Sequence, residues 1–203
     1  MASLTVKELL KGYITPGETD PFSGYRKGFL AGLSAQAILT LSTDDLQKFV
    51  QQPDHTTRAT GTFRCPSLGG DLPVSEGEFH LFVEEHNPYL RRMIYRLFTA
   101  GPQGPITISG FKTLGDNPST GIWFDCGWLW TRVFPGHITA EQEDTTQPVA
   151  AGVLFLYKWD FFRWDVLTLR IRGPQLISNF FRFAWFFLGT MIKFWFMKFF
   201  GHK

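Results

Sequence analysis

Residues 91–110 read RRMIYRLFTAGPQGPITISG, and this stretch decides the fold class. In its first half an apolar side chain returns at every second position, as at Met93 and Tyr95. The same spacing resumes after two Gly-Pro pairs, at Ile106 and Ile108. A period of two predicts β-strands with one face toward a core and the other in water.

The same alternation appears at residues 57–64, 78–83 and 166–172. Two further runs, 122–133 and 149–157, are apolar on both faces and predict strands that are covered on both sides. The connections are too short for the crossovers that parallel strands need, so we expect an antiparallel meander. About seven or eight such strands usually close into a barrel or a strongly curled sheet. The fold class is therefore mainly β.

The first part of the chain, residues 1–56, is expected to be a loop and helix region that packs on this barrel. Ser42 and Asp45 have the spacing of a capping box, which predicts a short helix that ends before Pro53. Gly24, Gly28 and Gly32 recur at every fourth position. This spacing fits either a helix packed closely against another backbone or an irregular lid. We expect the barrel domain at residues 57–173 and a membrane-associated helix at 174–203.

Composition and charge restrict the class of partner. The 203 residues have a net charge of +2, with 20 basic and 18 acidic side chains. Residues 174–203 contain no acid, and removing their four basic residues leaves 16 basic against 18 acidic, about −2 for the body. A nucleic-acid binder usually carries its basic face on the folded domain, so we expect no nucleic acid. The four basic residues, which suit an anionic lipid surface, are Arg182, Lys193, Lys198 and Lys203.

Targeting and redox signals indicate a cytoplasmic protein. Residues 1–11 have no apolar run of the kind that a secretory signal needs. Cys65 and Cys126 form no CxxC motif, and two reduced thiols are favoured over a disulfide. We therefore expect a location on the cytoplasmic side of a membrane, as a peripheral or monotopic protein.

Residues 174–203 read PQLISNFFRFAWFFLGTMIKFWFMKFFGHK. A helix from Leu176 to Phe200 would be about 37 Å long, which is enough to cross a bilayer. Lys193 would then lie near the middle of the hydrocarbon, at a cost of about 2.5–3.5 kcal/mol. On a helical wheel one arc of about 120° holds Ser178, Asn179, Arg182, Gly189, Thr190 and Lys193, and Lys198 lies outside it. The other side is aromatic and apolar, as in a helix that lies in the membrane interface. A helix among partner transmembrane helices, or one buried in a soluble partner, remains an alternative.

The side chains expected to bind the membrane are the aromatic and basic ones of this helix. They are Phe180, Phe181, Arg182, Trp185, Phe186, Phe187, Lys193, Trp195, Phe196, Lys198, Phe199 and Phe200.

Catalytic signatures are absent from the sequence, which has no nucleophile elbow, P-loop, dinucleotide fingerprint, zinc motif or paired CxxC. We name no catalytic, cofactor or metal residue, the cofactor stays unknown, and an enzyme is disfavoured. A ligand cavity would be lined by Trp123, Asp125, Trp128 and Trp130. The alternatives are a tryptophan-filled core and an ion pair at Asp125.

Several short motifs in one order resemble an accessory β domain associated with bacterial GMC-type, cholesterol-oxidase-like oxidoreductases. The resemblance covers about residues 10–173 and contains no catalytic signature. Where the related segments are richer in Asp and Thr, residues 124–128 read FDCGW, and the aromatic tail is an addition. The motifs are Gly17-Glu18-Thr19-Asp20, Gly24, Gly28, Thr60-Gly61, Cys65, Leu68-Gly69-Gly70-Asp71-Leu72-Pro73-Val74, Gly77-Glu78-Phe79, Leu81-Phe82-Val83, Arg92-Met93-Ile94-Tyr95-Arg96-Leu97-Phe98, Ile108-Ser109-Gly110-Phe111-Lys112, Asp116-Asn117-Pro118, Trp123, Leu129, Thr131-Arg132 and Gly136-His137.

The resemblance implies an accessory role near hydrophobic substrates, with the activity in another chain or domain. We expect a non-catalytic, membrane-attached subunit of a larger membrane assembly, whose partners are anionic lipids and other proteins. The alternative is a lipid- or sterol-binding barrel that presents apolar ligands to a membrane-associated oxidoreductase. A third hypothesis, a lipid-directed enzyme, would need a buried cluster such as His80 with Asp125.

Overall fold

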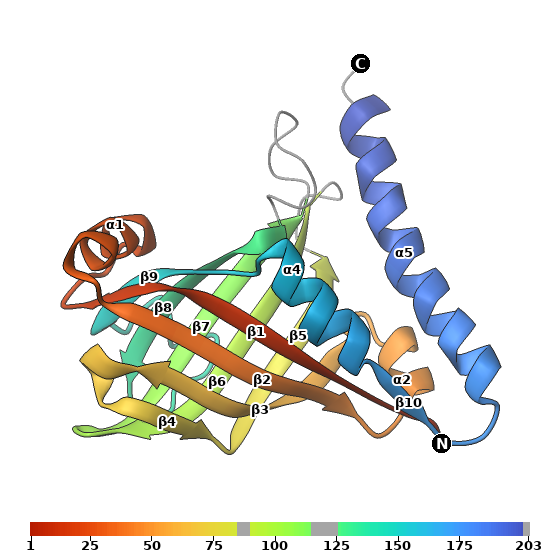
Figure 1. Ribbon diagram of the computed structural model, residues 1–203, viewed down its shortest axis with the longest axis horizontal. Coiled ribbons are helices and arrows are strands. Elements are labelled where there is room, and N and C mark those ends of the chain that lie inside the picture. The colour runs from red at the N-terminus through yellow and green to blue at the C-terminus, as the bar shows by residue number, and fades with distance from the viewer. Residues whose placement is uncertain (85–89, 115–125, 201–203) are drawn as a thin grey trace.

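Eight antiparallel strands close into a barrel, flanked by a few helices (Figure 1). The computed structural model describes residues 1–84, 90–114 and 126–200, with side chains as far as 193. The strands are β1 (Ser3–Pro16), β2 (Ser34–Thr43), β3 (Thr56–Cys65), β4 (Gly70–Val74), β5 (Glu76–Glu84), β6 (Arg91–Gly101), β7 (Gly104–Leu114), β8 (Trp128–Pro135), β9 (Ala150–Phe155) and β10 (Arg170–Arg172). The helices are α1 (Pro21–Ala31), α2 (Leu46–Gln51), η1 (Pro66–Leu68), α4 (Lys158–Asp160), η2 (Phe161–Val166, a π-helix) and α5 (Leu176–Phe200).

The strands follow one another around the barrel, and β1 closes it by pairing with β9. β4 and β5 act as one interrupted strand, because β4 pairs with the second half of β3 and β5 with the first half. Every pairing is antiparallel. The predicted antiparallel barrel is confirmed.

The barrel begins earlier than the expected boundary at residue 57, because β1 and β2 are two of its strands. β1 was not predicted as a strand, because Glu8 occupies one of its inward positions and Leu9 is buried on its outer face. Those two residues break the simple alternation of apolar and polar side chains. The predicted helix before Pro53 is confirmed as α2, but the predicted capping box is wrong. Ser42 lies in β2, and Asp45 is the N-cap, whose side chain accepts from the amides of residues 47 and 48.

Helix α1 packs on the outside of β9 and β1, which confirms the close-packed interpretation of the glycine spacing. A Cβ atom on Gly24 would lie 2.0 Å from the Ala151 carbonyl oxygen, so only glycine allows this approach. Gly28 meets Tyr13 and Thr15 in the same way, and Asp20 caps the helix by accepting from the Ser23 amide at 2.7 Å. The helix therefore covers the apolar outer face of β9.

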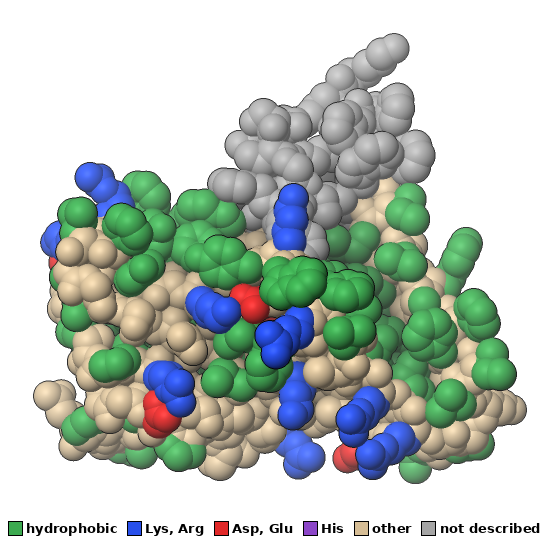
Figure 2. Space-filling model, viewed as in Figure 1, with side chains coloured by type: hydrophobic (Ala, Val, Ile, Leu, Met, Phe, Trp, Pro, Cys, Tyr) green, Lys and Arg blue, Asp and Glu red, His purple; other side chains and the backbone are tan. Residues whose placement is uncertain are grey.

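The chain leaves the sheet between β9 and β10, and this segment forms α4 and η2 beside the middle of β1. Here the Lys7 amide donates to the Thr168 hydroxyl at 2.8 Å, and Lys11 pairs with Asp160 at 2.8 Å. Trp159 and Phe162 of this segment are exposed. Figure 2 shows hydrophobic side chains interspersed with Lys and Arg side chains on the visible face of the molecule. The strand predicted at 166–172 is wrong for its first half, since only Arg170–Arg172 pair as β10.

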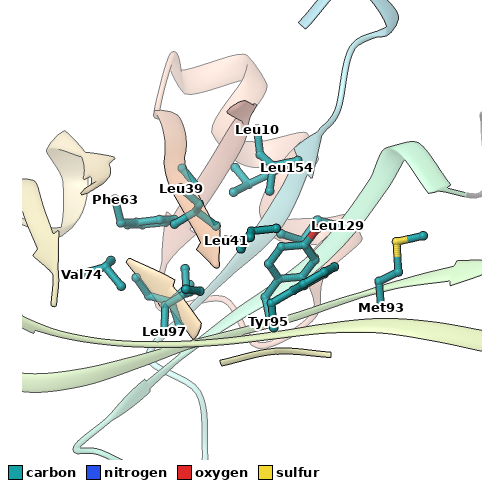
Figure 3. Close-up of a cluster of buried hydrophobic side chains, with 14 of the residues drawn as sticks. Leu10, Leu39, Leu41, Phe63, Val74, Met93, Tyr95, Leu97, Leu129 and Leu154 are labelled. Carbon is teal, nitrogen blue, oxygen red and sulfur yellow. The ribbon is translucent and has the colours of Figure 1, made fainter. Parts of the chain in front are cut away.

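Inward side chains fill one end of the barrel completely. Phe63, Leu39 and Leu154 are at most 1% exposed, and they meet Leu97 and Val74 across the interior (Figure 3). Tyr95 and Met93 lie toward the other side of the same cluster (Figure 3). There the filling is incomplete, and the remaining space is the candidate site.

Candidate ligand cavity

A cavity of about 380 Å³ lies inside the barrel, between its packed core and helix α5. Such a volume lies within the range of about 300–1,000 Å³ that ligand pockets occupy. Its walls are mainly apolar, with contributions from the barrel strands, from η2 and from α5. Barrel side chains that line it include Leu4, Val6, Leu41, Phe79, Leu81 and Met93.

One wall of the cavity carries a buried polar cluster of Glu8, Tyr95 and Lys112. The Lys112 ammonium pairs with Glu8 Oε1 at 2.6 Å, and the two side chains are 2% and 4% exposed. The Tyr95 hydroxyl donates to both Glu8 oxygens, at 2.8 and 3.0 Å, and Lys112 Nζ lies 5.0 Å from the centre of the Tyr95 ring. Burial, and then the charge of Glu8, raise the pKa of Tyr95 well above its usual value. The hydroxyl therefore stays a donor, and the charges of the pair cancel.

Asp165, on η2, lines the same cavity. Its Oδ1 atom is buried and has no hydrogen-bond partner among the described residues. Burial, followed by the charge of Glu8, raises the pKa of Asp165 to about 9. The side chain is therefore a neutral acid at neutral pH, which can both donate and accept a hydrogen bond.

Helix α5 covers the open end of the barrel, and Phe186 attaches it there. The centre of the Phe186 ring lies 4.6 Å from the centre of the His55 ring and 6.1 Å from the ring centres of Phe49 and Phe82. His55 and Phe82 have positive φ angles of 40° and 56°, and Phe82 sits where the β5–β6 register shifts. Phe187 also contacts Phe82, at 5.5 Å between ring centres. The irregular backbone at His55 and Phe82 therefore places the rings of these two residues against α5.

The opposite face of α5 is apolar and exposed. Its side chains at 177, 181, 185, 188 and 192 follow the three- and four-residue spacing of a single helical stripe, of which Leu188 also lines the cavity. Trp185 is the most exposed of them, at 82%. The flank beside this stripe carries the exposed cations Arg182 and Lys193. We call Ile177, Phe181, Trp185, Leu188 and Ile192 the outer stripe.

The residues expected to bind a membrane thus divide between two faces of the helix. Phe181, Arg182, Trp185 and Lys193 point outward, as a membrane role requires. Phe186 and Phe187 turn instead toward the barrel, and Phe180, which is 46% exposed, also lines the cavity. The remaining expected side chains lie outside the described ones, and they are Trp195, Phe196, Lys198, Phe199 and Phe200.

Of the expected cavity residues, Trp128 and Trp130 do not line the cavity. They lie on the outer face of β8, where Trp128 packs on Phe155 at 4.8 Å between ring centres. The inward positions of this strand belong to Leu129 and its alternate neighbours, which are buried. The prediction was wrong because a strand that is apolar on both faces does not reveal which face is inside. Trp123 and Asp125 lie outside the described residues.

The described residues form no catalytic cluster around His80, and Asp125, expected beside it, lies outside them. His80 lies on the outer face of β5, where it contacts Thr56 at 3.0 Å and Glu78 at 3.5 Å. No disulfide joins Cys65 and Cys126 in the structure, and Cys126 lines the cavity. Across residues 1–84, 90–114 and 126–200, no group of three or more His, Cys, Asp or Glu side chains could hold a metal ion.

Glu8, Lys112 and Asp165 were not predicted from the sequence as site residues. The alternation in 91–110 does place Tyr95 inward, and its continuation through Ile108 and Gly110 reaches Lys112. That period of two was the sequence signal that could have placed Tyr95 and Lys112 inside the barrel. Asp165 offered none, because its segment looks like a strand in sequence.

Comparison of the chain with protein-family models, with curated proteins and with solved structures yields no match. The resemblance to a GMC-associated domain therefore stays a prediction. Within the described part of the chain, no helix combines the length and the apolar character that crossing a bilayer demands.

Proposed function

We propose that this protein binds a single lipid-like molecule inside its barrel, at a membrane surface. The observation that carries the proposal is the apolar cavity of about 380 Å³ beneath α5. An eight-stranded barrel is just wide enough either to be filled by side chains or to hold one small ligand. Here the filling stops short at one end, where the walls offer few polar groups.

Retention of a ligand tests this proposal. The full chain is extracted from membranes in mild detergent and examined by native mass spectrometry, followed by lipid analysis. Leu41→Trp should fill the cavity, since Leu41 lines it and is only 6% exposed. Thr40→Trp is the matched control, because it adds the same ring to the outer face of the same strand. Equal retention by both variants, each still folded by circular dichroism, would overturn the proposal.

Charge complementarity supports attachment to an anionic membrane. Beyond Asp165 the chain contains no Asp or Glu, whereas six basic residues follow it. Four of these, Arg170, Arg172, Arg182 and Lys193, are exposed. Cations beside an exposed aromatic stripe suit the interface of an anionic bilayer. The outer stripe would enter the headgroup region while Phe186 keeps the helix on the barrel.

The second candidate function is a non-catalytic subunit of a membrane assembly, and the exposed outer stripe favours it. A soluble monomer rarely exposes a continuous apolar stripe without a partner. Sizing of the detergent extract distinguishes the two functions. A large stoichiometric complex identifies a structural subunit, and a single chain with bound lipid identifies a carrier. The carrier corresponds to the alternative from the sequence, a lipid- or sterol-binding barrel that presents apolar ligands to a membrane-associated oxidoreductase.

A further inference from the structure

Polar side chains interrupt the mainly apolar wall of the cavity, and a purely apolar ligand would leave their hydrogen-bonding groups unused. Glu8, Tyr95, Lys112 and Asp165 all line the cavity, and the rest of the wall is mainly apolar. A ligand that fills this space meets apolar side chains along its length and these four groups at one place. This matches a molecule with one polar end.

We infer that the cavity selects a lipid whose only polar group is an uncharged hydroxyl, such as a long-chain alcohol or a sterol. This inference rests on the proposed function and adds the chemical class of the ligand. It follows from the hydrogen-bonding state of the four polar groups.

The donors and acceptors are suited to a hydroxyl. Lys112 has three N–H donors, and one of them is directed at Glu8 at 2.6 Å. Asp165 Oδ1 is buried without a partner among the residues the structure describes. A hydroxyl both donates and accepts, so it can donate to Asp165 while it accepts from a neighbouring donor. A bound hydroxyl would then give Asp165 Oδ1 a hydrogen-bond partner, and a buried polar atom without one destabilises the fold.

The charge balance disfavours an anionic end. Lys112 is already neutralised by Glu8, so the cluster offers no net positive charge to a fatty-acid carboxylate. A carboxylate would also meet the negative charge of Glu8 across a low-dielectric cavity. Burial and Glu8 hold Asp165 in its neutral form, and an uncharged ligand leaves that form undisturbed.

Four ligands of equal chain length test the inference on the full chain in one detergent. They are tetradecan-1-ol, tetradecanoate, tetradecylamine and tetradecane, and each displaces an environment-sensitive fluorescent probe from the cavity. The Leu41→Trp variant gives the background from detergent partitioning. We expect the alcohol to bind about tenfold more tightly than the carboxylate or the alkane at neutral pH.

Variants at Asp165 show whether the cluster causes the preference. Asp165→Leu should reduce the ratio of alcohol to alkane affinity to near one, whereas Asp165→Asn, which keeps a donor and an acceptor, should retain most of it. Arg163→Gln, at an exposed position of the same helix, should leave the ratio unchanged.

Each result has one meaning. Tighter binding of the carboxylate or the amine than of the alcohol would overturn the inference and leave the proposed function standing. An unchanged ratio in Asp165→Leu would also overturn it. Failure of all four ligands to displace the probe would overturn the proposed function together with the inference.

Discussion

The first prediction concerns the buried ion pair that Glu8 and Lys112 form in the cavity wall. We predict that Lys112→Met lowers the free energy of unfolding by about 3–5 kcal/mol, the usual cost of leaving one member of a buried pair unpaired. The structure supports this range, because the pair is 2.6 Å long and at most 4% exposed. Only the Tyr95 hydroxyl would remain to hold the Glu8 carboxylate. The loss is a large share of the roughly 5–15 kcal/mol that stabilises a typical domain.

Urea denaturation of the full chain in one detergent, followed by circular dichroism, measures this loss. The control is Arg64→Met, which breaks a pair of the same 2.6 Å length at the surface, where both partners are at least half exposed. It should leave the midpoint almost unchanged, because water screens an exposed pair. The triple variant Glu8→Leu, Tyr95→Phe and Lys112→Met removes every partner at once and should recover most of the loss. A loss below about 1 kcal/mol in Lys112→Met would refute the reasoning, because that is the size of a solvated pair.

Three further predictions concern pH, the α5 contact and the membrane. Burial, followed by the charges of Glu8 and Asp160, raises the pKa of Asp165 from 3.8 to about 9, although Lys112 opposes this shift, so the folded state holds a proton that the unfolded state releases. The free energy of unfolding should therefore fall as pH rises through this window, by up to about 1.4 kcal/mol per pH unit, and Asp165→Asn should flatten that slope in pH-dependent urea titrations. Phe186→Ala should weaken the packing of α5 on the barrel by roughly 2 kcal/mol, since the Phe186 ring is half-buried. Tryptic cleavage at Arg182 should then become at least about tenfold faster. An equal effect of Phe181→Ala would contradict the contact between Phe186 and the barrel. Lys193→Glu should weaken binding to anionic vesicles by about 2 kcal/mol, and more than Lys203→Glu does, so equal partitioning of these two variants would argue against an interfacial helix.

The sequence predicts the barrel because most of its strands bury one face only. In β6 and β7 apolar inward residues recur at every second position, as at Met93, Tyr95 and Leu97, and this period of two is visible without a structure. The same rule failed at β8, where both faces are apolar and Trp128 was assigned to the wrong side. It failed again at 166–172, where the Thr168 hydroxyl, and not a strand backbone, accepts from the Lys7 amide. Alternation over so few residues does not tell a strand from a turn of helix that packs on a strand.

The candidate site was less predictable, because closure of the barrel is what creates it. Glu8 and Lys112 are 104 positions apart, on β1 and β7, and they face each other only across the finished interior. A local pattern can place each of them inward, yet it does not show which inward charges meet. Since a buried charge is tolerated mainly when it is paired, two opposite charges at inward positions of one barrel would have been reason to expect a pair.

The nature of that pair bears on its function. A buried ion pair is weak support for stability, because apolar residues of similar volume often replace it without loss. The packed end of this barrel shows the apolar alternative, with Phe63, Leu39 and Leu154 filling the interior. Three polar groups at the other end, beside an unfilled cavity, are therefore better explained by recognition than by folding. If the triple variant is as stable as the native chain but no longer prefers tetradecan-1-ol to tetradecane, the cluster serves the ligand. If it keeps that preference, Asp165 alone selects the hydroxyl, and the pair is a feature of the core.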